Sequence, residues 1–359
     1  HFYLGGFMKK KFLALMLSAL MIGTTACGGK TEKKEEASKD MKANEEVTGK
    51  VRIYTSMYED IIANMKPALK KKFPNCEIEF FQGGTGTLQT KIAGEIDAGK
   101  LACDIIMVAE PSYAYELKEK KVLHKFDIDN KDKLAFEYDK EGYWYPVRIS
   151  NMVLAYNPEK TKKEDLALSF KDFAEKQSLT GKISMSDPLK SGTALAAISG
   201  LKDKYTEDYF KKLAERKVAI EAGSVALTKL ETGEMDELMI LEESVLKKRQ
   251  DDNSSLEVIY PTDGTIVVPS PIMIVDEKLT ENKNTKAAEA ISKWFLSDEG
   301  QKFIVKGWMH SVLKDFPEVP YDAIKTSEIT GNSINVNWEQ MVKDRDSLRK
   351  MFTDTIGKK

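Results

Sequence analysis

The feature that most constrains the fold is an alternation of short β-rich runs with helical patterns. Residues 50–56, 76–84 and 103–111 are rich in apolar and β-branched side chains, and a segment with helical spacing of apolar residues follows each of them. Strands that alternate with helices predict βαβ units, in which helices cover both faces of a parallel sheet. The predicted fold class is therefore α/β with a doubly wound sheet.

The next block of the chain repeats this alternation less regularly. Strand-like runs lie at 151–157, 182–188, 218–224 and 237–244, with helical patterns between them. The stretch 256–275 is the most β-branched of the chain, and its prolines confine it to extended or turn geometry. A chain of 359 residues is about twice the usual domain size, so we expect two domains, or one domain split into two lobes.

The first segment has the layout of a secretory signal. Three lysines at 9–11 follow Met8, and about a dozen apolar residues and then small residues lead to Cys27. The apolar run is shorter than the roughly 20 residues of a membrane-spanning helix. We expect residues 1–7 to be an upstream extension and the rest of residues 1–27 to be a signal peptide. The protein is therefore expected to be exported.

The end of this signal resembles a bacterial lipobox. Such a pattern implies that Cys27 becomes lipidated and is the first mature residue, although Thr24 occupies the position where the pattern favours leucine. The alternative is a plain signal peptide with an incidental cysteine. Residues 28–49 are mostly Lys, Glu, Asn and Ser with little to bury, which predicts a disordered tether. The expected location is the outer face of the bacterial cell membrane, held by the lipid anchor, or the periplasm.

The net charge and the positions of the histidines argue against a nucleic-acid-binding protein, an enzyme and a metalloprotein. The 55 basic and 57 acidic side chains leave a net charge of −2, which implies no nucleic-acid partner. Neither His124 nor His310 lies in a zinc-like cluster or beside a recognisable nucleophile, so we expect no enzyme, no metal site and no cofactor. Cys76 and Cys103 each begin an apolar run, which favours small buried residues; whether they pair is left open.

Candidate binding residues follow from the strand–helix pattern. In doubly wound sheets, ligands bind beyond the carboxyl ends of the strands, where helix N-termini point inward. Arg148 is a further candidate, because its guanidinium suits a phosphate or carboxylate; a surface ion pair is the alternative. The predicted ligand-binding residues are Ser56, Gly84, Thr85, Gly86, Thr87, Glu110, Arg148, Asp187, Ser191, Gly192, Thr193, Ser224, Glu242 and Glu243.

Two glycine- and hydroxyl-rich segments stand before predicted helices. Residues 83–87 (GGTGT) follow one strand-like run, and residues 191–193 (SGT) follow another. Glycines allow close backbone approach, and the first turn of a helix has unpaired N–H groups at its positive dipole end. The two helix N-termini, one from each lobe, could face each other and share one anionic group. Ordinary capping and a tight turn remain the alternative reading.

A pair of carboxylates, Glu242 and Glu243, is expected to end the strand-like run 237–244. Because strand residues alternate between faces, only one of the two can point into a cleft. Such a residue could hold a ligand hydroxyl or ammonium group. An exposed strand end is the alternative, and a catalytic acid/base pair has little support.

Together these motifs resemble a known family. Lipobox-like Cys27 is followed by VRIYTS, GGTGTLQTKIAGE, CDIIMV, YPVRISNMVLAYNPEK, SDPLKSGTA, DGTIVVPSPIMIV and TKAAEAISKWFLSDEGQKFI. This order of motifs resembles that of extracellular solute-binding lipoproteins of ABC importers. The branch that it resembles contains ferric-ion, hexose-phosphate and aminoethylphosphonate binders, and the resemblance covers the chain from about residue 50 onward.

The resemblance implies a periplasmic-binding-protein-like (type II) fold with a hinge between two doubly wound lobes. Lobe 1 would comprise residues 50–152 and 266–310, and lobe 2 would comprise residues 153–265 and 311–359. A small anionic solute would be trapped between the lobes and delivered to a membrane permease. The family also implies a monomer without enzymatic activity.

The ligand class is inferred from the run that ends before the return to the first lobe. Ferric binders of this branch hold iron with adjacent tyrosines, whereas the matching positions 241–244 read LEES. The hexose-phosphate relatives carry an acidic pair there, which this run resembles. A phosphorylated or phosphonate solute with hydroxyls or an amine, such as a sugar phosphate, is therefore expected. The alternative is a receptor for ferric iron or another inorganic ion.

Overall fold

The computed structural model describes residues 44–357. The expected signal peptide, the lipidation of Cys27 and most of the expected tether lie outside the described residues. Val47 is buried and the first strand begins at Gly49, so the folded part starts before the predicted boundary at residue 50. None of the helices in the described part is both long and apolar enough to cross a membrane.

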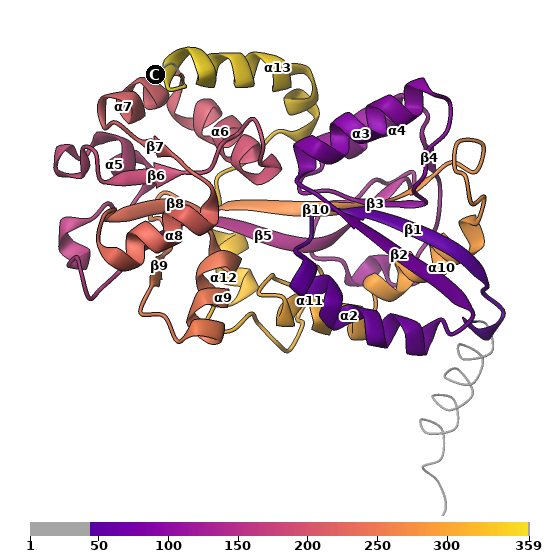
Figure 1. The fold of residues 1–359 in the computed structure, drawn as a ribbon. Coiled ribbons are helices and arrows are strands. Elements are labelled where there is room, and N and C mark those ends of the chain that lie inside the picture. Colours follow the sequence, from indigo (N-terminus) through magenta and orange to yellow (C-terminus); the bar gives the residue numbers. More distant parts are fainter. Residues whose placement is uncertain (1–43, 358–359) are drawn as a thin grey trace, which may run out of the picture. The chain divides into compact units, whose positions relative to one another are not determined.

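The chain forms two α/β lobes that lie side by side (Figure 1). In the first lobe, β1 pairs in parallel with β2 and β3, as the strand–helix alternation predicted. The strands of this lobe are β1 (Gly49–Thr55), β2 (Cys76–Gln82), β3 (Ile105–Met107) and β4 (Leu123–His124). Its helices are α2 (Glu59–Lys72), α3 (Thr85–Asp97), α4 (Ser112–Glu119), α10 (Thr285–Phe295) and α11 (Asp298–Lys306).

Helices cover both faces of this sheet, as Figure 1 shows: α3 and α4 lie on one side and α2, α10 and α11 on the other. Side-chain alternation along β1 explains the two layers. Val51 and Ile53 enter one hydrophobic core, whereas Tyr54 enters the core under α3 and α4. α2 turns Ile61, Met65 and Leu69 inward at helical spacing, with acidic residues in its first turn and lysines in its last.

The second lobe repeats the parallel arrangement, because β6 pairs in parallel with β7 and β8. Its strands are β6 (Ile183–Met185), β7 (Ala219–Ile220), β8 (Glu237–Leu241) and β9 (Glu257–Ile259). The helices of this part of the chain are α5 (Phe170–Glu175), α6 (Gly192–Tyr205), α7 (Asp208–Glu215), α8 (Gly223–Thr232) and α9 (Glu242–Asp252). Three short 3-10 helices complete the described connections, at Lys131–Lys133, Lys163–Asp165 and Gln177–Leu179.

Two long antiparallel strands, β5 (Trp144–Tyr156) and β10 (Ile266–Val275), run from one lobe to the other. They join the two sheets into one, with the strand order β2-β1-β3-β10-β5-β8-β6-β7. The register between them shifts at Ser270 and Pro271. These strands occupy the two stretches that the sequence suggested as crossings between lobes, and the exact lobe boundaries stay a prediction.

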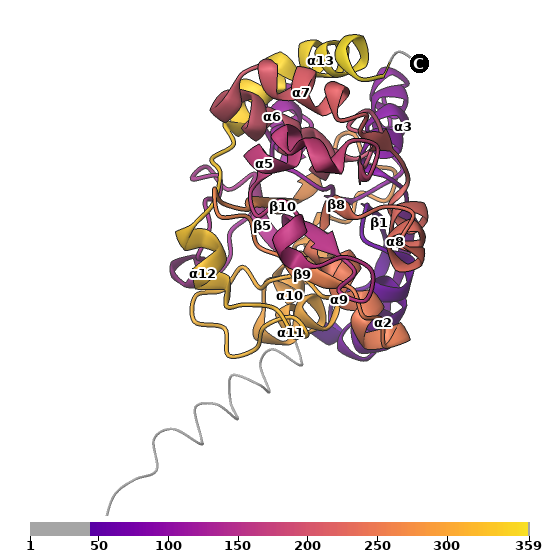
Figure 2. The same ribbon diagram turned by 90° about the vertical axis from the view of Figure 1, so that its left-hand side faces the viewer.

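The C-terminal part contacts both lobes. Val312 and Leu313 pack in the core of the first lobe, just beyond the boundary expected at residue 310. α12 (Thr326–Gly331) and α13 (Trp338–Thr355) follow. Met341, Leu348 and Phe352 of α13 enter the core of the second lobe. Figures 1 and 2 both show α13 lying above α6 and α7.

Both cysteines of the described part are free thiols. Cys103 is fully buried, in agreement with the expected small core residue, and burial raises the pKa of its thiol. Cys76 is only partly buried.

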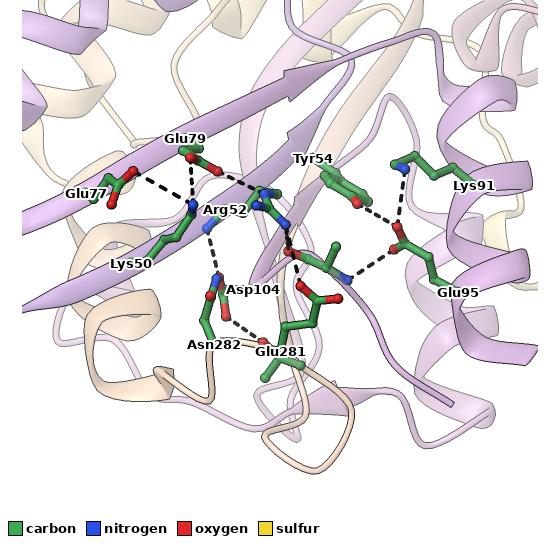
Figure 3. Close-up of polar contacts among 12 residues, drawn as sticks. Lys50, Arg52, Tyr54, Glu77, Glu79, Lys91, Glu95, Asp104, Glu281 and Asn282 are labelled. Atoms are coloured by element: carbon green, nitrogen blue, oxygen red, sulfur yellow. Dashed lines mark hydrogen bonds and ion pairs between the residues drawn. The ribbon is translucent and has the colours of Figure 1, made fainter. Parts of the chain in front are cut away.

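A buried carboxylate ties the first lobe together (Figure 3). Asp104 is 1% exposed and accepts hydrogen bonds from the Arg52 backbone N–H at 2.8 Å, Thr280 Oγ1 at 2.6 Å and Asn282 Nδ2 at 2.8 Å. It thereby joins β1, the start of β3 and the chain after β10. The surrounding pairs, such as Lys50 with Glu79 at 2.8 Å, lie nearer the surface.

We expect Asp104→Asn to lower the free energy of unfolding by about 2 kcal/mol, because the amide replaces one carboxylate oxygen with an NH2 group and can no longer accept all three hydrogen bonds. Urea denaturation followed by circular dichroism measures the change. The matched control is Glu77→Gln: its side chain is 68% exposed and lies 3.8 Å from Lys50, so about 0.5 kcal/mol or less is expected. Equal losses in the two variants would contradict the structural role of Asp104.

Candidate functional site

A cavity of about 480 Å³ lies between the lobes. The carboxyl ends of the parallel strands of both lobes meet here, and α3, α6, α8 and α9 begin around it, as expected for a doubly wound architecture. We call this space the interlobe cavity. Its polar and glycine lining is Ser56, Tyr58, Gln82, Gly84, Thr85, Arg148, Ser150, Ser186, Asp187, Lys190, Ser191, Gly192, Thr193, Glu221, Gly223, Glu243 and Ser244.

The start of α3 forms one wall of the interlobe cavity. Gly84 is the N-cap residue without a side-chain cap, and Leu88 makes the first backbone bond of the helix, to the Gly84 carbonyl oxygen. The N–H groups of residues 85–87 are therefore without an intrahelical acceptor. Thr85 is 3% exposed, and its Oγ1 accepts from the Ala109 N–H at 3.1 Å, which fixes the helix start against the end of β3.

The start of α6, from the second lobe, also lines the interlobe cavity. Ser191 caps this helix, because its Oγ accepts from the Ala194 N–H at 3.2 Å, and it also lies 3.0 Å from Thr193 Oγ1. Asp187 closes the preceding turn by accepting from the Leu189 N–H at 2.9 Å. Ordinary capping is thus confirmed for Ser191, and the same residues line the interlobe cavity.

The two helix starts meet closely. A β-carbon built on Gly192 would lie 3.0 Å from Thr85 Cγ2 and 3.1 Å from Ala109 Cβ. Gly84 and Gly192, one from each predicted glycine-rich helix start, both line the interlobe cavity, and their role in holding an anion stays a prediction. Gly86 and Thr87 instead line a neighbouring groove of about 660 Å³ between α3, α4 and α13, and Gly86 faces the backbone of residues 189–190.

Arg148 lies on β5 at the floor of the interlobe cavity. It is 5% exposed, its Nη2 donates to Ser56 Oγ at 2.8 Å, and its Nη1 lies 3.4 Å from Met309 Sδ. Within residues 44–357 no carboxylate forms a direct ion pair with it, so the alternative of a surface ion pair is wrong. Burial lowers the pKa of its guanidinium, although the negative potential of Glu243 acts in the opposite direction.

The expected strand end at Glu242 and Glu243 is wrong. β8 ends at Leu241, and both carboxylates stand in the first turn of α9, where the positive end of the helix dipole favours them. Glu243 lines the interlobe cavity, and Ser150 Oγ donates to its Oε1 at 3.1 Å. Glu243 Oε2 is buried without a hydrogen-bond partner. Burial raises the pKa of Glu243 to about 7, although Arg148 and the bond from Ser150 oppose the shift.

Glu242 points away from the interlobe cavity. Its Oε1 lies 2.6 Å from His310 Nε2, and its Oε2 accepts from the Tyr260 hydroxyl. His310 Nδ1 is 3.0 Å from Thr326 Oγ1, so the imidazole connects α9 with α12. Only one of the two carboxylates therefore faces the interlobe cavity, as expected. The cause differs from the expected strand alternation: successive residues of a helix point in different directions around its axis.

Two further candidates also lie away from the interlobe cavity. Glu110 is fully buried, and its carboxylate accepts from the Ser112 N–H at 2.6 Å and from Ser112 Oγ at 2.8 Å. It follows β3 as predicted, but its side chain turns into the protein. Ser224 is exposed on α8, where its neighbours Glu221 and Gly223 line the interlobe cavity instead.

Several lining residues were missed from the sequence. Ser150 and Met152 share the face of β5 that carries Arg148, so alternation along that strand could have found them. Lys190 directly precedes Ser191, and Ser244 directly follows Glu243. Tyr58 and Ser186 were not missed: they stand in the loops after predicted strands, where the rule of strand ends places binding residues, and both line the interlobe cavity.

The interlobe cavity has an uneven charge distribution. Helix starts with free N–H groups, together with Arg148 and Lys190, supply positive potential, and three carboxylates, Asp187, Glu221 and Glu243, supply negative potential. Among the described residues no group of three His, Cys, Asp or Glu side chains could hold a metal ion. The arrangement is suited to a small polar solute with separate regions of charge.

Comparison with known proteins agrees with this architecture. The family model described as bacterial extracellular solute-binding protein matches residues 64–312. The protein is similar to periplasmic binding protein AfuA from Actinobacillus pleuropneumoniae with exogenous fructose-6-phosphate bound: 22% identity and a TM-score of 0.72, over 86% of this chain and 99% of that chain. Iron-bound HitA from Pseudomonas aeruginosa is 18% identical with a TM-score of 0.72, over 85% and 99% of the two chains.

A third similar structure is the substrate binding protein of an ABC transporter from Agrobacterium tumefaciens, at 16% identity and a TM-score of 0.74, over 88% of this chain and 96% of that chain. No curated protein matches the sequence. At these identities the solved structures show the fold, which is the α/β periplasmic binding protein fold that the sequence predicted.

The family match covers well over half of the chain, and its members bind solutes rather than catalyse reactions. Such a protein captures a small solute outside the cell membrane and passes it to the permease of an ABC importer. Both the predicted receptor function and the expected absence of enzymatic activity agree with this match. The chain therefore belongs to the bacterial extracellular solute-binding proteins.

Proposed function

We propose that the solute is a small organic molecule with a phosphate or phosphonate group at one end and hydroxyls or an amine at the other. The observation that carries the proposal is the pairing of two features in one interlobe cavity. Two helix starts, at Thr85 and at residues 191–193, converge on it, and the unpartnered Oε2 atom of Glu243 belongs to the same lining.

The helix starts would hold the anionic group. Phosphate and phosphonate oxygens accept several hydrogen bonds at once, and free N–H groups at helix N-termini supply donors with a favourable dipole. The Thr193 hydroxyl can add a donor. Arg148 adds a full positive charge at the floor of the interlobe cavity without a carboxylate paired to it. Mostly neutral donors suit a receptor that must release its solute to a permease.

Glu243 would select the other end of the solute. A solute hydroxyl or ammonium group can donate to Oε2, which has no partner within the described protein. With a pKa raised to about 7, this carboxyl is poised to ionise when an ammonium group approaches. A cavity of about 480 Å³ is within the size range of sites for small organic ligands.

Ferric iron is the second candidate, because HitA is described as iron-bound. Against it stand the run LEES in place of adjacent tyrosines and the finding that no cluster of three metal-ligating carboxylate, thiol or imidazole groups occurs in residues 44–357. Phenolate oxygens suit a hard Fe(III) ion, and no adjacent pair of tyrosines supplies them at positions 241–244. Organic phosphates are therefore the better-supported class.

Native mass spectrometry of protein purified without refolding tests the class of solute directly, and isothermal titration then measures binding of fructose-6-phosphate, 2-aminoethylphosphonate and Fe(III) citrate. We expect at least one organophosphorus compound to bind with micromolar or tighter affinity. The double variant Thr85→Val with Ser191→Ala should weaken that binding about tenfold or more while the protein stays folded. Binding of Fe(III) alone, or full affinity in the double variant, would overturn the proposal.

We also propose that Cys27 is lipidated and anchors the protein at the outer face of the cell membrane. The lipobox-like residues and the hydrophilic segment 28–43 support this location. Expressed in a bacterial host, the protein should fractionate with membranes, and Cys27→Ala should release it to the soluble fraction. Equal fractionation of both forms would contradict the anchor.

A further inference from the structure

A buried arginine joins the two lobes outside the interlobe cavity. Arg345 belongs to α13, whose Met341, Leu348 and Phe352 pack in the core of the second lobe. Its Nη1 donates to Glu116 Oε2 at 3.0 Å and its Nη2 to Ser112 Oγ at 2.9 Å. Both acceptors belong to α4, whose apolar residues pack in a core of the first lobe. The contact therefore spans the lobes.

The surroundings of Arg345 are built to receive a guanidinium. Arg345 is 8% exposed, and the Tyr113 ring of α4 lies 6.0 Å from its Cζ. The Ser112 hydroxyl donates to Glu110 Oε1 at 2.8 Å, so its oxygen is free to accept from Arg345. Glu110, which lies outside the interlobe cavity, thus orients the serine that Arg345 binds.

We propose that Arg345 is a positioning residue that latches the lobes in the closed arrangement and thereby raises solute affinity without touching the solute. No residue of α13 lines the interlobe cavity. The strands β5 and β10 connect the lobes directly, so a rotation of the lobes about these strands would separate α13 from α4. We name the contacts of Arg345 with Glu116 and Ser112 the α13 latch.

Charge and burial explain why the α13 latch favours closure. Charge-assisted hydrogen bonds shielded from water are stronger than exposed ion pairs, and an arginine that leaves such a site loses two of them at once. A second, weaker contact lies beside the latch, where Arg349 Nη2 is 3.4 Å from Gln89 Oε1 of α3. Because Arg345 acts through lobe closure, its loss should accelerate solute release more than it slows capture.

The first test compares Arg345→Met, which keeps much of the aliphatic packing, with Lys350→Met on the same helix, whose side chain is 76% exposed. Both proteins are refolded without added solute, and small-angle X-ray scattering and hydrogen exchange are recorded. We expect Arg345→Met to have a larger radius of gyration and about tenfold faster exchange in residues 112–119, with Lys350→Met like the parent protein. Identical scattering and exchange in the two variants would overturn the proposal.

A charge exchange separates the α13 latch from a general packing role. Glu116→Arg alone and Arg345→Glu alone should each open the protein, and the double variant should recover the parent scattering curve at least in part. Failure of the double variant to differ from the single variants, in proteins whose circular dichroism shows an intact fold, would overturn the latch. The proposal rests on solute binding by lobe closure and not on the class of solute. Scattering and exchange are measured without solute, so failure here is distinguishable from failure of the proposed organophosphorus specificity.

Discussion

Replacing Gly192 with alanine is expected to weaken solute binding about 10- to 100-fold while the protein stays folded. The added β-carbon would lie 3.0 Å from Thr85 Cγ2 and 3.1 Å from Ala109 Cβ, both in the opposite lobe. Overpacking of this kind costs about 1–3 kcal/mol. Here the protein can avoid the close contact most easily by holding the lobes slightly apart, which weakens binding by a similar free energy. Isothermal titration with the solute identified by native mass spectrometry measures the loss.

The matched control for this variant is Gly94→Ala. Gly94 lies inside α3, and apart from the backbone of its own helix and its chain neighbours nothing would lie within 4 Å of its added β-carbon, so affinity should not change. Thermal unfolding of Gly192→Ala should resemble that of the parent protein, because the lobes keep their own cores. Parent-like affinity in Gly192→Ala would show that the contact between the starts of α3 and α6 is not needed for binding.

Glu237→Gln is expected to stabilise the protein by on the order of 4 kcal/mol above pH 8 and to change stability little near pH 4.5. Glu237 is fully buried in β8; its Oε2 accepts from the Ala167 N–H at 2.9 Å, and its Oε1 has no partner. Burial raises its pKa from 4.5 to about 8. Glutamine can still accept the bond from Ala167 but cannot ionise.

The sign follows from where the proton is held. Between pH 4.5 and about 8 the folded protein keeps the proton on Glu237 while the unfolded chain releases it, so stability falls as pH rises through this window. Urea denaturation of both proteins from pH 4.5 to 8.5 should show a shallower decline for Glu237→Gln. Glu234→Gln serves as the control, because that side chain is 62% exposed. A parallel decline in all three proteins would contradict the prediction.

The fold could be predicted largely from local patterns. Parallel strands, helices on both faces and the starts of α3 and α6 follow from short-range alternation and from glycine and hydroxyl residues near helix starts. The end of β8 at Leu241 and the start of α9 at Glu242 could not be predicted, because an apolar run followed by two glutamates is compatible with either a strand end or a helix start. Tertiary packing decided between them.

The site was predicted in position better than in side-chain direction. The rule of strand ends located both Glu110 and Glu243, yet only Glu243 lines the interlobe cavity. Glu110 turns inward because Ser112, two residues later, offers two donors, and Arg345, more than 200 positions away, completes that cluster. Long-range partners of this kind, like the pairing of His310 with Glu242, leave no local trace in the sequence.

The connection between the lobes has a mechanical consequence. At the register shift of β5 and β10, Pro146 stands opposite Pro271, and Pro269 lies two residues away. Proline carries no N–H, so this short stretch of the ribbon has fewer cross-strand bonds than the stretches on either side of it. We therefore expect this stretch to bend more easily than the rest of the ribbon, so that the two halves of the molecule pivot about it rather than slide along each other.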